Sequence, residues 1–105
     1  SGMEICIGDI VFIRVKDMYS DVVLSSGEKY TVRRPLSVWE AMLPAEDFIR
    51  ISDSCIAGCR FVSKMEKKGV RLDNYTELFS FSTRRRKDCE EKFMYYCRKM
   101  ARYGG

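Results

Sequence analysis

The sequence predicts a mainly β fold, a compact antiparallel arrangement of short strands with one short internal helix and one C-terminal helix. Two observations predict it. Short apolar and β-branched runs alternate with turn-forming residues, and helical spacing of apolar residues occurs in two places. The chain has 105 residues, enough for a single domain with one hydrophobic core.

The strands begin with Ile10–Val15, an apolar and β-branched run that favours extended structure. Asp21–Leu24 follows, and the turn at 25–28 leads into a third strand, so these strands form consecutive hairpins. The last strand is expected to close the sheet, with Phe79 and Phe81 on one face. We expect about eight strands, at residues 10–15, 21–24, 28–33, 48–51, 55–57, 61–65, 70–72 and 76–82.

The first helix is expected between two prolines, because Pro35 suits a first helical turn and Pro44 ends the element. The second is expected from about Arg84 to Arg102, with Ser82 or Thr83 as its N-cap. In each helix the apolar residues share one face: Leu36, Trp39 (the expected core residue), Met42 and Leu43 in the first, and Cys89, Phe93, Tyr96, Cys97 and Met100 in the second.

Several classes of protein are excluded by what the sequence lacks. No histidine occurs, which excludes Ser-His-Asp and Cys-His catalysis, and neither glycine-rich nucleotide fingerprint is present. We therefore expect no enzyme, no cofactor and no small-molecule substrate. Because no membrane-length apolar run and no signal peptide occur, we expect a cytoplasmic location. Residues 3–105 should form one domain, with Ser1 and Gly2 remaining from cloning.

The five cysteines are expected to be reduced thiols without a metal. The spacings Cys55-x3-Cys59 and Cys89-x7-Cys97 do not match the C-x2-C pairs that hold zinc. A redox-active Cys89 is the alternative, because the neighbouring cations Arg85, Arg86 and Lys87 would lower a thiol pKa. An inert Cys89 on the face of a helix is the preferred interpretation.

Positive charge is concentrated in the last part of the chain. Residues 1–63 hold 7 basic and 9 acidic residues, whereas residues 64–105 hold 12 basic and 6 acidic residues. The densest cluster is the run Arg84–Lys87. A localised positive patch is typical of a protein that binds a polyanion, although such a run is also common at a solvated helix start.

The central stretch Phe48–Gly58 can be compared with the pattern F-x-R-[IV]-H-[RK]-S-x-[LIV]-V-N. It matches at Phe48, Arg50, Ile51, Ser54 and Ile56, and it departs at Ser52, Asp53, Ala57 and Gly58. With the opening strand, the helix after Pro35 and the serine-basic run at 82–87, this stretch resembles the LytTR DNA-binding domain. That family forms the output half of many bacterial response regulators in two-component systems. The resemblance covers residues 9–90.

The resemblance implies that loops, rather than a recognition helix, meet the DNA duplex. Tyr19, Asp53 and Arg84 would then approach base edges in the major groove. Arg84 could grip a guanine bidentately, and Asp53 could accept from a cytosine amine or instead shape its own turn. The remaining candidates for DNA contact are basic: Arg33, Arg34, Lys64, Arg85, Arg86 and Lys87.

The expected partner is double-stranded DNA, bound sequence-selectively in transcriptional regulation by two copies on adjacent half-sites. The alternative is a protein-interaction module that has lost or weakened its DNA binding, which Asp53 and Gly58 motivate because characteristic polar positions are substituted there. Single-stranded nucleic acid is a third hypothesis, with Tyr30, Tyr75, Phe79, Tyr95 or Tyr96 as stacking platforms.

Overall fold

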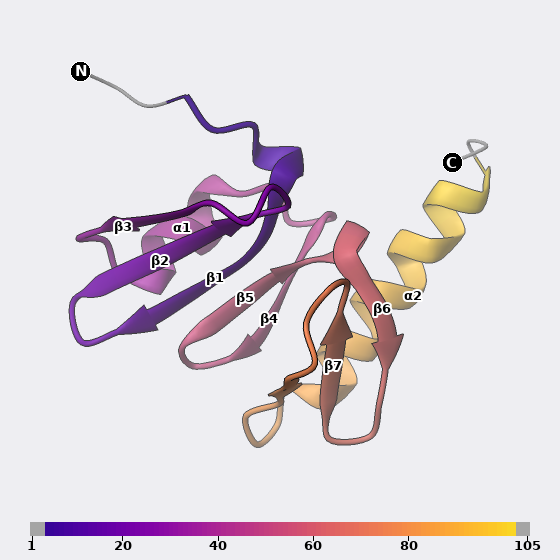
Figure 1. Cartoon of the computed structure of the whole chain (residues 1–105). Helices are drawn as coiled ribbons and strands as arrows, with labels where there is room; N and C mark the ends of the chain where they lie inside the picture. Colours follow the sequence, from indigo (N-terminus) through magenta and orange to yellow (C-terminus); the bar gives the residue numbers. More distant parts are fainter. Residues whose placement is uncertain (1–3, 103–105) are drawn as a thin grey trace.

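The computed structural model describes residues 4–102, which form two antiparallel sheets and two α-helices (Figure 1). The larger sheet has the strand order β3-β2-β1-β5-β4 and the smaller one β6-β7-β8. The strands are β1 (Ile10–Lys16), β2 (Tyr19–Leu24), β3 (Lys29–Val32), β4 (Phe48–Ser52), β5 (Cys55–Gly58), β6 (Val62–Met65), β7 (Gly69–Leu72) and β8 (Leu78–Ser80). The helices are α1 (Leu36–Met42) and α2 (Arg86–Arg102), with 3-10 turns η1 (Ile7–Asp9) and η2 (Cys59–Phe61).

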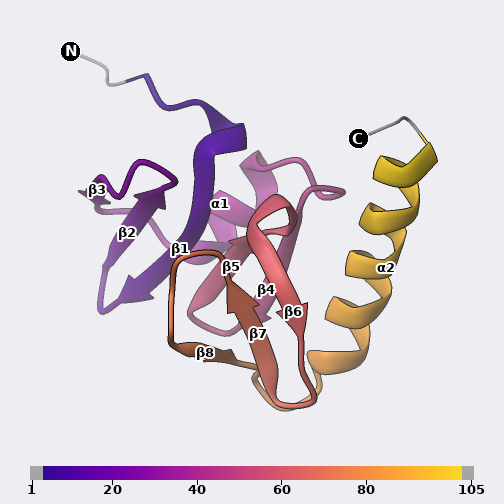
Figure 2. The same ribbon diagram turned by 45° about the vertical axis from the view of Figure 1, so that its right-hand side comes forward.

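The larger sheet is covered on both faces. Strand β1 lies at its centre, so the run Ile10–Ile13 is buried without alternation. On one face, Trp39 and Leu43 of the α1 region pack against Ile13 and Ile56. The other face meets the smaller sheet and the first turns of α2, as Figure 2 shows. There the Phe12 and Phe79 ring centroids are 4.9 Å apart.

The predicted fold class is confirmed: the chain is mostly antiparallel strands with two helices. The prediction that the last strand closes one sheet is wrong, because β6, β7 and β8 pair only with each other. Strand β4 has no strand beyond it, and α2 and the segment before it cover its outer edge. The last strand is also shorter than predicted. The expectation for Ser1 and Gly2 lies outside the described residues.

Helix α2 begins at Arg86 rather than at Arg84. The backbone of Arg84 has a φ of 78°, which is left-handed and incompatible with a helical turn. The Ser82 hydroxyl does not cap the helix, because it accepts a hydrogen bond from Asp53 instead. The apolar stripe of α2 packs unevenly: Cys89 is fully buried, whereas Cys97 and Met100 near the end are exposed.

Candidate nucleic-acid interface

Four connections between elements follow one another along the lower left side of the molecule in Figures 1 and 2, from the β1–β2 turn at the left to the β6–β7 turn at the bottom. They are the β1–β2, β4–β5 and β6–β7 turns and the segment between β8 and α2. We call them the turn ridge and define it as residues 16–19, 52–55, 66–69 and 81–85. The sequence separates these segments, and the two sheets bring them together.

Hydrogen bonds, all but one of them between backbone groups, join the four segments in a row. The Val15 amide, next to the first turn, donates to the Ser54 carbonyl at 2.8 Å. The Asp53 amide donates to the Ser82 hydroxyl at 2.9 Å, and the Ser82 amide donates to the Ile51 carbonyl at 3.1 Å. The Phe81 amide donates to the Lys68 carbonyl at 2.9 Å. The ridge is therefore one hydrogen-bonded surface rather than four independent loops.

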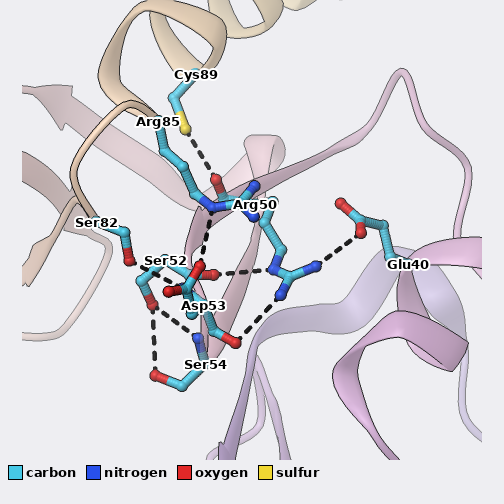
Figure 3. A network of polar contacts seen from close by, with 8 residues as sticks. All are labelled: Glu40, Arg50, Ser52, Asp53, Ser54, Ser82, Arg85 and Cys89. Atoms are coloured by element: carbon cyan, nitrogen blue, oxygen red, sulfur yellow. Dashed lines mark hydrogen bonds and ion pairs between the residues drawn. The ribbon is translucent and has the colours of Figure 1, made fainter.

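The β4–β5 turn is held by Arg50, whose guanidinium makes three hydrogen bonds (Figure 3). Its Nε donates to the Ser52 carbonyl at 2.9 Å and its Nη2 to the Asp53 carbonyl at 3.1 Å. Its Nη1 pairs with the Glu40 carboxylate at 2.8 Å. The Arg50 side chain is only 16% exposed. The arginine thus pairs with an acid rather than projecting into solvent.

Asp53 places its carboxylate at the tip of this turn, where it is 86% exposed and lies 3.5 Å from Nε of Arg85. The turn itself is shaped by Ser52, whose hydroxyl accepts from the Ser54 amide at 3.2 Å. The role in shaping the turn that the sequence suggested for Asp53 therefore belongs to Ser52 and Arg50. The Asp53 carboxylate is balanced by a cation of the ridge.

The basic run splits into paired and unpaired members. Arg85 faces Asp53, and Arg86 lies 3.5 Å from Glu90 on the next turn of α2. Arg84 and Lys87 are exposed, and neither pairs with a carboxylate within residues 4–102. Arg84 lies in segment 81–85 of the ridge, where its backbone is left-handed. Because its guanidinium is exposed and has no carboxylate partner among the described residues, it is free to bind an anion.

Tyr19 is the first residue of β2 and is 51% exposed, next to an exposed Met18. Arg33 lies beside the same turn, because its Nη2 is 3.3 Å from the Met18 sulfur. Arg34 differs: its guanidinium stacks over the Trp39 ring at 4.6 Å, and its carbonyl accepts from the Ser20 hydroxyl. The structure thus brings Tyr19 and Arg33 to the ridge and turns Arg34 toward α1.

Lys64 is exposed on β6, the edge strand that leads into the β6–β7 turn. Two further lysines, Lys67 and Lys68, occupy that turn and are exposed, and they are absent from the contacts predicted from the sequence. Neither pairs with a carboxylate among the described residues. The two adjacent lysines, between the strands expected at 61–65 and 70–72, could have indicated this contact. Nothing in the local sequence, however, places their turn next to the run Arg84–Lys87.

The exposed end of the protein offers cations, a tyrosine hydroxyl and backbone groups, and it offers no reactive thiol. Burial raises the pKa of Cys55 and Cys59 to about 12 and that of Cys89 to about 11. The Cys89 Sγ lies 3.1 Å from the Arg50 carbonyl. Burial therefore favours the inert interpretation of Cys89 over the redox alternative, because desolvation outweighs the nearby cations. Among residues 4–102, no cluster of His, Cys, Asp or Glu could hold a metal ion.

Most candidate stacking aromatics lie away from the ridge or in the core. Phe79 is buried, and Tyr75 packs edge-on against Phe12 at 5.3 Å. Tyr30 donates from its hydroxyl to Glu28 at 2.9 Å. Tyr95 is exposed, but it belongs to α2. The ridge therefore lacks the aromatic row that single-stranded nucleic acid would need.

In the described part of the chain, no helix has the length and apolarity needed to cross a membrane.

A small β domain that presents hydrogen-bonded basic turns at one end has the architecture of a polyanion-binding protein. Residues 2–94 match the family model of the LytTR DNA-binding domain, and the chain belongs to that family. The resemblance noted in the sequence is confirmed. The family consists of DNA-binding domains rather than enzymes, and the expectation of a bacterial transcription-regulating output domain agrees with it.

A solved structure supports the fold. The chain is similar to the LytTr DNA-binding domain of a protein from Bacillus cereus described as a methyl-accepting/DNA response regulator. The two agree with a TM-score of 0.75 at 18% identity, and the match covers 84% of each chain. At this identity the likeness concerns the fold. No curated protein is significantly similar in sequence.

Proposed function

We propose that this domain regulates transcription by binding double-stranded DNA sequence-selectively, with the turn ridge entering the major groove. The continuity of the ridge supports this proposal: hydrogen bonds hold four turns in one row, and exposed cations without carboxylate partners flank them. The major groove is about 12 Å wide and admits a two-stranded β-ribbon, and three of the four segments of the ridge are turns of antiparallel hairpins. Cations at both ends of the row can reach phosphates on the two sides of the groove.

Within this proposal, Tyr19, Asp53 and Arg84 supply the contacts to base edges. Arg84 donates bidentately to guanine, and Tyr19 contacts a base edge or a phosphate through its hydroxyl. Arg85 acts as the counter-ion that allows the Asp53 carboxylate to approach the duplex. Phosphates are contacted by the exposed cations Arg33, Lys64, Lys67, Lys68, Arg86 and Lys87, while Arg34 contributes its charge from beside Trp39.

One such domain covers a short stretch of DNA. We therefore propose that two copies bind adjacent half-sites, as expected for a small module with a limited footprint. The stoichiometry on a long duplex, measured by sedimentation, tests this part. Two copies per selected site are expected, and a single copy would contradict it.

The central experiment is a selection from random-sequence duplexes followed by a salt titration of the selected DNA. If about five phosphates are contacted, log affinity should fall with log salt at a slope of about −4 to −5. A single-stranded oligonucleotide of the same sequence is the control and should bind more weakly. A pool that shows no enrichment, together with a salt-insensitive dimer, would overturn the proposal and favour the protein-interaction module.

A further inference from the structure

We propose that Arg50 is a positioning residue for DNA recognition: its guanidinium fixes the shape of the β4–β5 turn, and Glu40 of α1 holds the guanidinium in place. This inference deepens the proposed function and rests on it. Arg50 does not reach toward the DNA itself. Its side chain is 16% exposed, and Glu40 neutralises its charge at 2.8 Å.

The turn needs external support because β4 is irregular where it approaches the ridge. The register against β5 shifts between Arg50 and Ser52, so that Arg50 faces Ile56 while Ser52 faces Cys55. A shift of this kind is a β-bulge, which bends the strand and takes backbone groups out of the ladder. Backbone groups released in this way need other partners.

Those partners are present for four consecutive carbonyls. The carbonyl of residue 50 accepts from the Cys89 thiol, and that of residue 51 accepts from the Ser82 amide. The carbonyls of residues 52 and 53 both accept from the one guanidinium of Arg50. Figure 3 shows this guanidinium between the turn and Glu40. Arg50 therefore supplies hydrogen-bond donors to the two carbonyls that lie nearest to the proposed DNA contact.

The planar geometry of arginine explains why this position needs more than a positive charge. Nε and the two Nη atoms donate in three fixed directions, and here they meet two carbonyls and one carboxylate. A lysine would keep the charge facing Glu40, but its single ammonium group cannot reproduce the fork. The tip that carries Asp53 would then sample other conformations, and each would present different groups to the duplex.

The test compares Arg50→Met and Arg50→Lys with the wild type on duplexes that the wild type selects from a random pool. For both variants we expect the preference for the selected duplex over a scrambled one to fall about fivefold or more, the size of one lost base contact. The salt slope should stay unchanged, because no phosphate contact is removed. Amide exchange at Asp53 should accelerate, which reports the loosened turn directly.

Arg60→Met is the matched control. Arg60 also donates to a backbone carbonyl, that of Gly8 at 3.0 Å, and lies 3.8 Å from Asp9, but it belongs to η2 at the opposite end of the molecule (Figure 1). Arg60→Met changes the net charge by the same amount as Arg50→Met, and it should leave the preference for the selected duplex intact. Glu40→Gln should give a smaller loss of preference for the selected duplex than the Arg50 variants. If Arg50→Met fails to fold, Glu40→Gln and Arg50→Lys together still test the proposal.

The outcomes separate the two proposals. A wild-type chain without affinity for any duplex would overturn the proposed function and this role together. A wild-type chain that binds DNA, alongside an Arg50→Lys variant with full preference, would overturn the positioning role alone. An equal loss in Arg60→Met would also overturn it, because net charge would then explain the effect.

Discussion

The amide of Asp53 donates a hydrogen bond of 2.9 Å to the hydroxyl of Ser82, a residue 29 positions later in the chain. The Ser82 amide donates in turn to the Ile51 carbonyl at 3.1 Å. This double link fastens the β4–β5 turn to the segment that carries Arg84. Two of the three proposed base-contacting positions are therefore coupled mechanically.

Replacing Ser82 with alanine tests this link. The Asp53 amide would lose its acceptor, and one hydrogen bond of this kind contributes about 0.5–1.5 kcal/mol to the free energy of unfolding. Urea unfolding should show a loss in that range, with faster amide exchange at Asp53. Ser63→Ala is the control, because Ser63 is an exposed serine on β6. Equal losses in the two variants would contradict the link.

Arg84→Ala should weaken duplex binding without weakening the fold. Alanine has the same difficulty as arginine with a φ of 78°, so the free energy of unfolding should change little. If the side chain reads a base, preference for the selected duplex should fall by about 1–3 kcal/mol. If it contacts a phosphate, the salt slope should drop by about 1. Titration with duplex DNA distinguishes these results.

Arg102→Ala removes the same charge from the far end of α2 and provides the comparison. Binding that is unchanged in Arg84→Ala, or reduced equally in both variants, would remove Arg84 from the interface.

Gly58→Ala should destabilise the fold. A Cβ at this position would lie 2.5 Å from the Ile10 carbonyl oxygen, so one of the two strands must move. We expect a cost of about 1–3 kcal/mol, typical of overpacking, measured as a lower urea midpoint. Gly8→Ala is the matched control, because its nearest contact would be an ordinary 3.8 Å. Two indistinguishable midpoints would show that the strands adjust freely.

The same contact gives Gly58 a packing role in this chain. Close packing of β5 against the backbone near Ile10 requires glycine, and the residue lies at the end of β5 away from the turn ridge. The departure from the family pattern at Gly58 therefore gives no support to a loss of DNA binding.

Alkylation should distinguish the cysteines. Because burial raises the pKa of Cys55 and Cys59 to about 12 and that of Cys89 to about 11, almost no thiolate forms at these sites near pH 8. Iodoacetamide should modify Cys6 and Cys97, which are exposed, in the native protein. All five should react in denaturant, as intact mass would show. Rapid native modification of Cys89 would contradict its burial.

Much of the fold was predictable because its signals are local. The β-branched run of β1, the prolines that frame α1 and the helical stripe of α2 each act within a few residues. The separate small sheet was not predictable, because strand pairing depends on which edges meet in space. The start of α2 was misplaced because nothing in the sequence showed that Arg84 adopts a left-handed backbone.

The sequence by itself determined the fold class, the family and the uneven distribution of charge, since these follow from residue types and their spacing. Only the tertiary structure decided which cations are free. Arg85 is paired with Asp53 and Arg34 stacks on Trp39, while Arg84 and the Lys67–Lys68 turn are exposed on the ridge. The physical reason is that ion pairs and hydrogen bonds act over only a few ångströms. Folding alone brings residue 15 within that distance of residue 54, residue 53 within it of residue 82, and residue 68 within it of residue 81.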